Sequence, residues 1–66
     1  MAVAKVLEIS STSSQSFEDA IRTGLERASQ TVDNVRGAWI KEQKIDVDNN
    51  TITQFRVDMK VTFEIK

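Results

Sequence analysis

QFRVDMKVTFEI, residues 54–65, alternates polar and apolar side chains without a break. Period-two alternation is the pattern of a β-strand with one buried and one solvated face. Because the apolar members are bulky, the buried face needs a second layer to cover it. The alternation therefore predicts a long antiparallel strand over residues 52–65.

The segments on its N-terminal side supply the rest of a sheet. Residues 2–9 are rich in β-branched side chains and predict a short strand, and the hydroxyl-rich residues 10–16 predict a connection. Residues 35–47 predict a strand with mixed alternation. Residues 48–50, Asp-Asn-Asn, predict a turn because asparagine tolerates positive φ.

One amphipathic helix is expected after the serines. Ser16 is placed as its N-cap, with Asp19 three residues later in a variant of the capping box. Apolar residues then recur at steps of three and four, which puts them on one helix face: Phe17, Ala20, Ile21, Leu25, Ala28 and Val32. Gly24 lies on or beside this stripe and predicts close packing against a bulky group. The helix is expected to end near Asp33 or Asn34.

The order of these elements predicts an α+β fold, β-α-β-β, in a single domain over residues 1–66. The helix returns the chain and the hairpin reverses it, so a fully antiparallel three-stranded sheet has the order 1-3-2 and wraps around the helix. The second and third strands exceed the usual five or six residues. Their ends need partners, and a chain of 66 residues is marginally stable alone. Both points predict self-association.

Composition excludes several classes of function. There is no cysteine and no histidine, so disulfides, thiolate zinc sites and the commonest general base are absent. The net charge of −1 does not suggest a nucleic-acid binder, and no apolar run spans a membrane. The N-terminus lacks a signal-peptide pattern, which favours the cytoplasm. No carboxylate pair is flanked by a nucleophile or base, so we do not expect an enzyme.

Two segments, SFEDAIRTGLERASQTVDNV and FRVDMKVTFEI, in this element order resemble the dodecin family. The resemblance implies a homododecameric shell that binds a flavin, riboflavin or FMN, at contacts between subunits and serves in storage or buffering. Some relatives are linked instead to calcium or coenzyme A. A flavin-free dodecin that binds such ligands, or a purely structural assembly, is therefore the alternative.

The resemblance also indicates site residues. In the family, a tryptophan at the start of the second strand stacks on the flavin, and a glutamine after an aromatic on the third strand bonds to the ring edge. A gapless alignment puts the first position on Gly37 and the second on Arg56, so both residue types differ. Trp39 lies two residues from Gly37 and is expected on the same face.

The candidate cofactor-binding residues are therefore Gly37, Trp39, Gln43, Gln54 and Arg56. Trp39 is alternatively an interface anchor, and Arg56 alternatively pairs with Asp58 or an acid of a neighbour. Residues 46–50, DVDNN, partly resemble the start of a calcium loop but lack its glycine and distant glutamate. No metal ligand is assigned.

Overall fold

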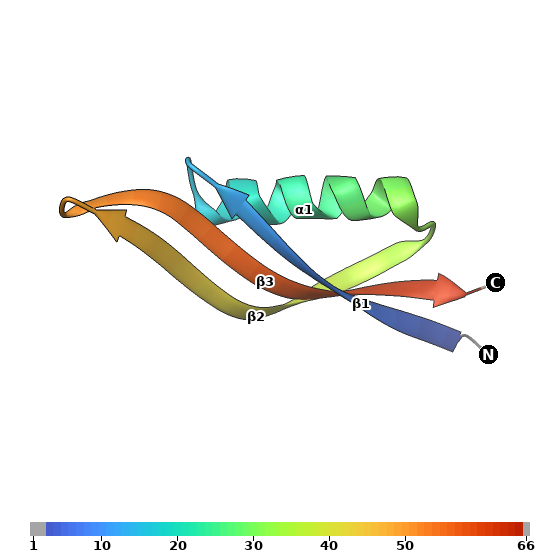
Figure 1. Cartoon of the computed structure of the whole chain (residues 1–66). Coiled ribbons are helices and arrows are strands. Elements are labelled where there is room, and N and C mark those ends of the chain that lie inside the picture. The colour runs from blue at the N-terminus through green and yellow to red at the C-terminus, as the bar shows by residue number, and fades with distance from the viewer. Residues whose placement is uncertain (1–2, 66) are drawn as a thin grey trace.

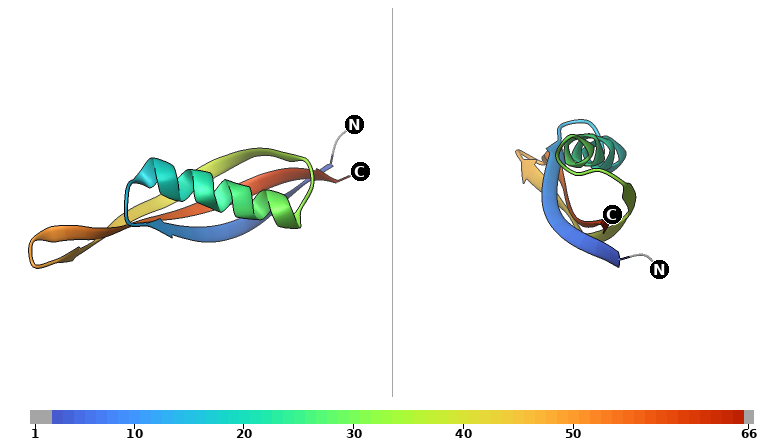
Figure 2. Two further views of the ribbon diagram at one scale, coloured as in Figure 1. Left: turned by 90° about the horizontal axis from the view of Figure 1, so that it is seen from above. Right: turned by 90° about the vertical axis from the view of Figure 1, so that its right-hand side faces the viewer.

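A computed structural model describes residues 3–65, which form four elements in the predicted order (Figure 1). They are β1 (Val3–Ser13), α1 (Phe17–Thr31), β2 (Val35–Asp48) and β3 (Thr51–Ile65). The three strands form one antiparallel sheet in the order β1-β3-β2. The sheet curls around α1, as the end view in Figure 2 shows. The predicted β-α-β-β fold and strand order are confirmed.

The first strand is longer than predicted, because β1 continues through the serines to Ser13. Ser10 lies opposite Asp58 and donates a hydrogen bond to its carboxylate at 2.8 Å. Since β3 is long, it offers backbone partners to the serine run, and this pairing overrides the turn preference of serine. Ala2, the predicted first residue of the strand, lies outside the described residues.

The helix begins where the capping pattern predicts. The Ser16 hydroxyl accepts a hydrogen bond from the Asp19 backbone N–H at 3.0 Å. The helix ends at Thr31, two or three residues before the predicted end near Asp33 or Asn34, because Val32 is already extended. Asn34 then adopts a φ of 62° and turns the chain into β2.

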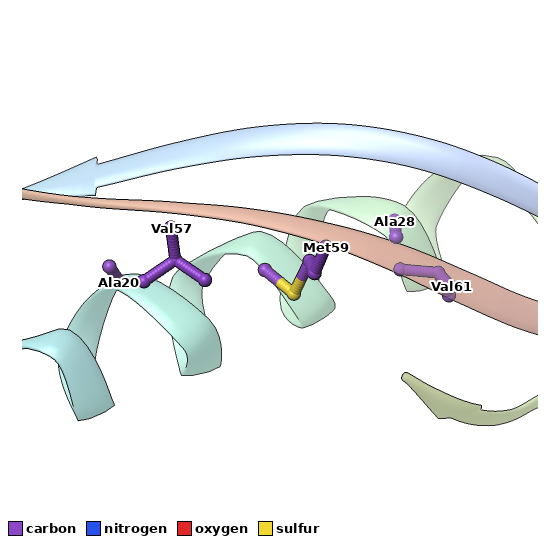
Figure 3. Close-up of a cluster of buried hydrophobic side chains, with 5 residues drawn as sticks. All are labelled: Ala20, Ala28, Val57, Met59 and Val61. Atoms are coloured by element: carbon purple, nitrogen blue, oxygen red, sulfur yellow. The ribbon is translucent and has the colours of Figure 1, made fainter. Parts of the chain in front are cut away.

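Small helix residues allow α1 to lie close to the sheet. Ala20 and Ala28 are buried against the central strand β3, whose Val57, Met59 and Val61 form the rest of the core (Figure 3). Gly24 is also buried. A Cβ on Gly24 would overlap the Met59 side chain and would lie 3.1 Å from the Ser11 Cβ. The predicted close packing at Gly24 is therefore confirmed.

The β2–β3 hairpin extends well beyond the helix (Figure 1). It closes with Asn49 and Asn50 at φ values of 53° and 62°, which confirms the predicted turn. The molecule measures 51 × 19 × 13 Å, and every residue from 36 to 45 of β2 is exposed. Within residues 3–65, no helix is long and apolar enough to cross a membrane.

Candidate functional site

The face of the sheet turned away from α1, here called the outer face, carries most of the candidate residues. Directly paired residues of an antiparallel sheet point to the same side. Gly37 lies opposite Thr62 and Trp39 opposite Lys60, and both β3 residues alternate with the core residues. Gly37 and Trp39 therefore share the outer face, as their spacing predicts.

Trp39 is the largest exposed apolar side chain of this face. It is 72% exposed and lines a shallow hollow of about 170 Å³ together with Ile40, Lys41 and Lys60. Beside it, a Cβ added to Gly37 would have no neighbouring atom within 4 Å. The indole thus stands next to an open part of the strand, where a flat ring has room to lie against it.

Arg56 and Gln54 lie on the outer face too, but near the hairpin. Arg56 is opposite Lys44, and its guanidinium is 3.7 Å from the Asp46 carboxylate. This partner differs from Asp58, the acid that the sequence suggested. Arg56 lies six positions along β3 from Thr62, the partner of Gly37, or about 20 Å at the strand rise. Within one chain, Arg56 and Gly37 therefore cannot contact the same ring.

Gln43 points to the opposite side of the sheet from Trp39. It lies opposite the core residue Val57, whereas simple alternation from Trp39 would put it on the outer face. The cause is a register shift between Ile40 and Glu42, where Lys41 is the additional residue of a β-bulge. The structure therefore groups Gly37 with Trp39 and Arg56 with Gln54, and separates Gln43 from both pairs.

An ion pair that the sequence analysis missed crosses the outer face beside Trp39. Lys41 reaches over the central strand to Glu8 of β1, with 2.9 Å between Nζ and Oε1. This hydrogen bond to Lys41 lowers the pKa of Glu8, and the same bond to Glu8 raises the pKa of Lys41. The predicted strand order already makes β1 and β2 neighbours of the same central strand, so an ion pair across that strand could have been considered. The bulge at Lys41, which the sequence alone did not reveal, decides that Lys41 is the partner.

The described residues do not bring metal ligands together. Among residues 3–65, no group of three or more acidic side chains is close enough to hold a metal ion. Asp46, the first acid of the DVDNN stretch, lies beside Arg56, and the two asparagines form the hairpin turn. A metal site built from this chain would need carboxylates from more than one copy.

Comparisons with known proteins agree with this fold. A family model described as Dodecin matches residues 3–66. Calcium dodecin of Mycobacterium tuberculosis is 35% identical over 66 residues, which are 100% of this chain and 93% of that protein. The structure of a dodecin from Streptomyces davaonensis is 32% identical with a TM-score of 0.93, covering 98% of this chain and 96% of that one. The calcium dodecin structure, described as having a novel calcium-binding site, is 34% identical with a TM-score of 0.83, covering 97% and 91%.

Proposed function

Because the chain belongs to the dodecin family, whose members are dodecameric, non-enzymatic assemblies that bind small ligands, we propose that it forms a homododecameric shell that sequesters a flavin. The ligand, riboflavin or FMN, is held at contacts between subunits, and the shell stores or buffers it. A cytoplasmic location remains a prediction from the sequence.

The observation that carries this proposal is the exposure of Trp39 beside Gly37. An indole that is 72% exposed leaves one of the largest apolar surfaces of the chain in water. The open space at Gly37 extends the platform along the strand, so that a ring larger than the indole can be covered. Stacked aromatic rings gain about 0.5–1.5 kcal/mol beyond the area that they bury.

The distance between the two pairs of candidate residues argues for a site made by two copies. About 20 Å of strand separates Arg56 from the position opposite Gly37, and about 13 Å separates it from the position opposite Trp39, so the guanidinium and the indole of one chain do not meet over one ring. When two outer faces meet around a two-fold axis, the partner subunit's Arg56 can lie over Trp39. A two-fold contact repeats this arrangement, and each contact then holds two ligands.

Trp39 and the partner subunit's Arg56 then each have a role in holding the ring. Trp39 stacks on one side of the isoalloxazine and excludes water from it. The partner subunit's Arg56 offers planar N–H donors to the polar edge of the ring or to a phosphate. The side chain of Arg56 is 41% exposed, and its 3.7 Å contact with Asp46 is loose enough to be exchanged for a ligand. Stacking against the indole would also quench the excited state of the flavin.

Calcium is the second candidate ligand, because a 35% identical relative is named calcium dodecin. The described part of this chain has no cluster of three acidic side chains. Since Ca²⁺ takes six to eight oxygen ligands, a calcium site here would have to lie where several subunits meet. The exposed indole has no role in such a site.

A ligand titration tests the proposal and separates the two candidates. The assembled protein is titrated with riboflavin and with FMN while flavin fluorescence is followed, and native mass spectrometry counts the bound ligands. Saturable quenching at one flavin per subunit is expected. If no flavin binds up to high micromolar concentration, while calorimetry of chelator-treated protein detects Ca²⁺ binding, the flavin proposal is wrong and calcium takes its place.

A further inference from the structure

Three residues form one row across the outer face of the sheet, one from each strand. Glu8 of β1 and Trp39 of β2 both lie directly opposite Lys60 of β3, the central strand. Directly paired residues point to the same side of a sheet, with Cβ atoms about 4.5–5.5 Å apart. Lys60 therefore has a carboxylate on one side and the indole of the proposed ligand site on the other.

By this register Glu8 is the expected ion-pair partner of Lys60, because opposite charges that face each other across two strands attract. The structure forms a different pair. The Glu8 carboxylate accepts a hydrogen bond from Lys41, with 2.9 Å between Nζ and Oε1. Since β1 and β2 are separated by the central strand, or by about 10 Å at the usual strand spacing, both side chains must extend toward each other to meet.

The β-bulge at Lys41 explains this longer contact. In a regular register Lys41 would lie opposite Asp58, but as the additional residue of the bulge it has no residue opposite it on β3. Asp58 lies opposite Glu42 instead and accepts a hydrogen bond from Ser10 at 2.8 Å. The bulge thus redirects Lys41 from the near acid to Glu8 on the far strand.

The consequence concerns Lys60. Among residues 3–65 it makes no ion pair, because Lys41 engages the acid that lies opposite it. The hydrogen bond from Lys41 is the main cause that lowers the pKa of Glu8, and the charge of Lys60 contributes less. Lys60 is half-buried and lines the same hollow of about 170 Å³ as Trp39. Its ammonium therefore keeps N–H donors for a ligand in that hollow.

We infer that Lys60 is a ligand-binding residue of the Trp39 site, and that Lys41 is a positioning residue that keeps Lys60 available by occupying Glu8. The inference rests on the proposed function, because it places the Lys60 ammonium at the edge of the ring that stacks on the indole. The short distance between paired residues favours an acceptor of the ring itself, a carbonyl oxygen, over a phosphate at the end of a flexible chain. Lys60 thus adds a charged donor from the same chain as the indole.

The test of Lys60 measures flavin affinity in a variant that keeps the apolar stem of the side chain. The assembled protein is titrated with riboflavin and with FMN, and native mass spectrometry checks the assembly of every variant. Lys60→Met should weaken the binding of both flavins by about tenfold, as expected for the loss of one charge-assisted hydrogen bond. In the matched control, Lys5→Met removes a lysine that lies opposite Phe63 on the helix side of the sheet, and the affinity should stay unchanged.

Lys41 is tested by rescue. In Lys41→Met the Glu8 carboxylate loses its partner and pairs with Lys60, so both flavins should bind about two- to fivefold more weakly. Adding Glu8→Gln to this variant removes the competing carboxylate and should restore the affinity, whereas Glu8→Gln alone should leave it unchanged. A merely structural role of Lys41 would not give this restoration, because the second substitution removes a further charge from the same face.

Several outcomes would overturn the inference while flavin binding itself stands. Unchanged affinity of Lys60→Met would mean that the ammonium does not contact the ligand, and a loss for FMN alone would mean that it contacts the phosphate and not the ring. If Lys41→Met binds normally, or if Glu8→Gln does not reverse its defect, Lys41 is not the positioning residue. If the natural protein binds neither flavin, the proposed function fails, and this inference fails with it.

Discussion

Replacing Trp39 by alanine separates ligand binding from assembly. A buried tryptophan covers about 150–250 Å², and 72% of this side chain is exposed in the single chain. A stacked ring covers one of its two sides, or roughly 50–90 Å², which contributes about 1–2 kcal/mol at 25 cal/mol per Å². With the additional stacking energy of about 0.5–1.5 kcal/mol, the loss is about 2–4 kcal/mol, or a weakening of flavin binding by about 30- to 900-fold.

Folding should change much less than binding. An exposed strand residue contributes at most about 1 kcal/mol through its β-propensity. The assay is the flavin titration of the variant, combined with native mass spectrometry of the unliganded protein. Val6→Ala removes an exposed apolar side chain from the same face without removing an aromatic ring, so it should bind flavin nearly as tightly as the natural protein.

Two results would refute the reasoning about Trp39. If the variant stays dodecameric and binds flavin with unchanged affinity, the indole is not the platform. If the variant falls apart into smaller species before any ligand is added, Trp39 is an interface anchor, and the loss of binding would be secondary.

Three further predictions concern stability, and all variants are compared at equal protein concentration because assembly contributes to stability. Gly24→Ala gains about 1 kcal/mol of helix propensity but overpacks the core at a cost of about 1–3 kcal/mol, so the denaturation midpoint falls. In the matched control Gly37→Ala the added methyl group has open space, so the midpoint stays unchanged or rises. Ser16→Ala removes the N-cap and lowers the free energy of unfolding by about 1 kcal/mol, measured by chemical denaturation. Glu8→Gln removes the ion pair with Lys41. Because this contact lowers the pKa of Glu8, its stabilisation is present above pH 4.5 and disappears as the pH falls below that value. The melting temperatures of the variant and the natural protein should therefore differ near neutral pH and converge in acid, and a difference that stays constant with pH would contradict the ion pair.

The local elements of the fold follow from patterns that need no tertiary information. The alternation of residues 54–65 determines β3 and its buried face, and the helical spacing with Ser16 as N-cap determines where α1 begins. The two asparagines determine the turn because they tolerate positive φ. Strand order followed from the sequence as well, since only the order 1-3-2 makes all pairs antiparallel.

The pairing of the strands, not the sequence pattern, decides which candidate residues lie together in the site. Alternation put Trp39 and Gly37 on one face, but the bulge at Lys41 turns Gln43 to the other. A bulge depends on how a strand matches its partner, so a period-two pattern read along one strand cannot contain it. Likewise, β1 extends through its serines only because the long β3 lies beside it. Arg56 of β3 contacts Asp46 only because β2 lies along the other side of β3. Side-chain chemistry is local, whereas the register that brings side chains together is a property of the whole sheet.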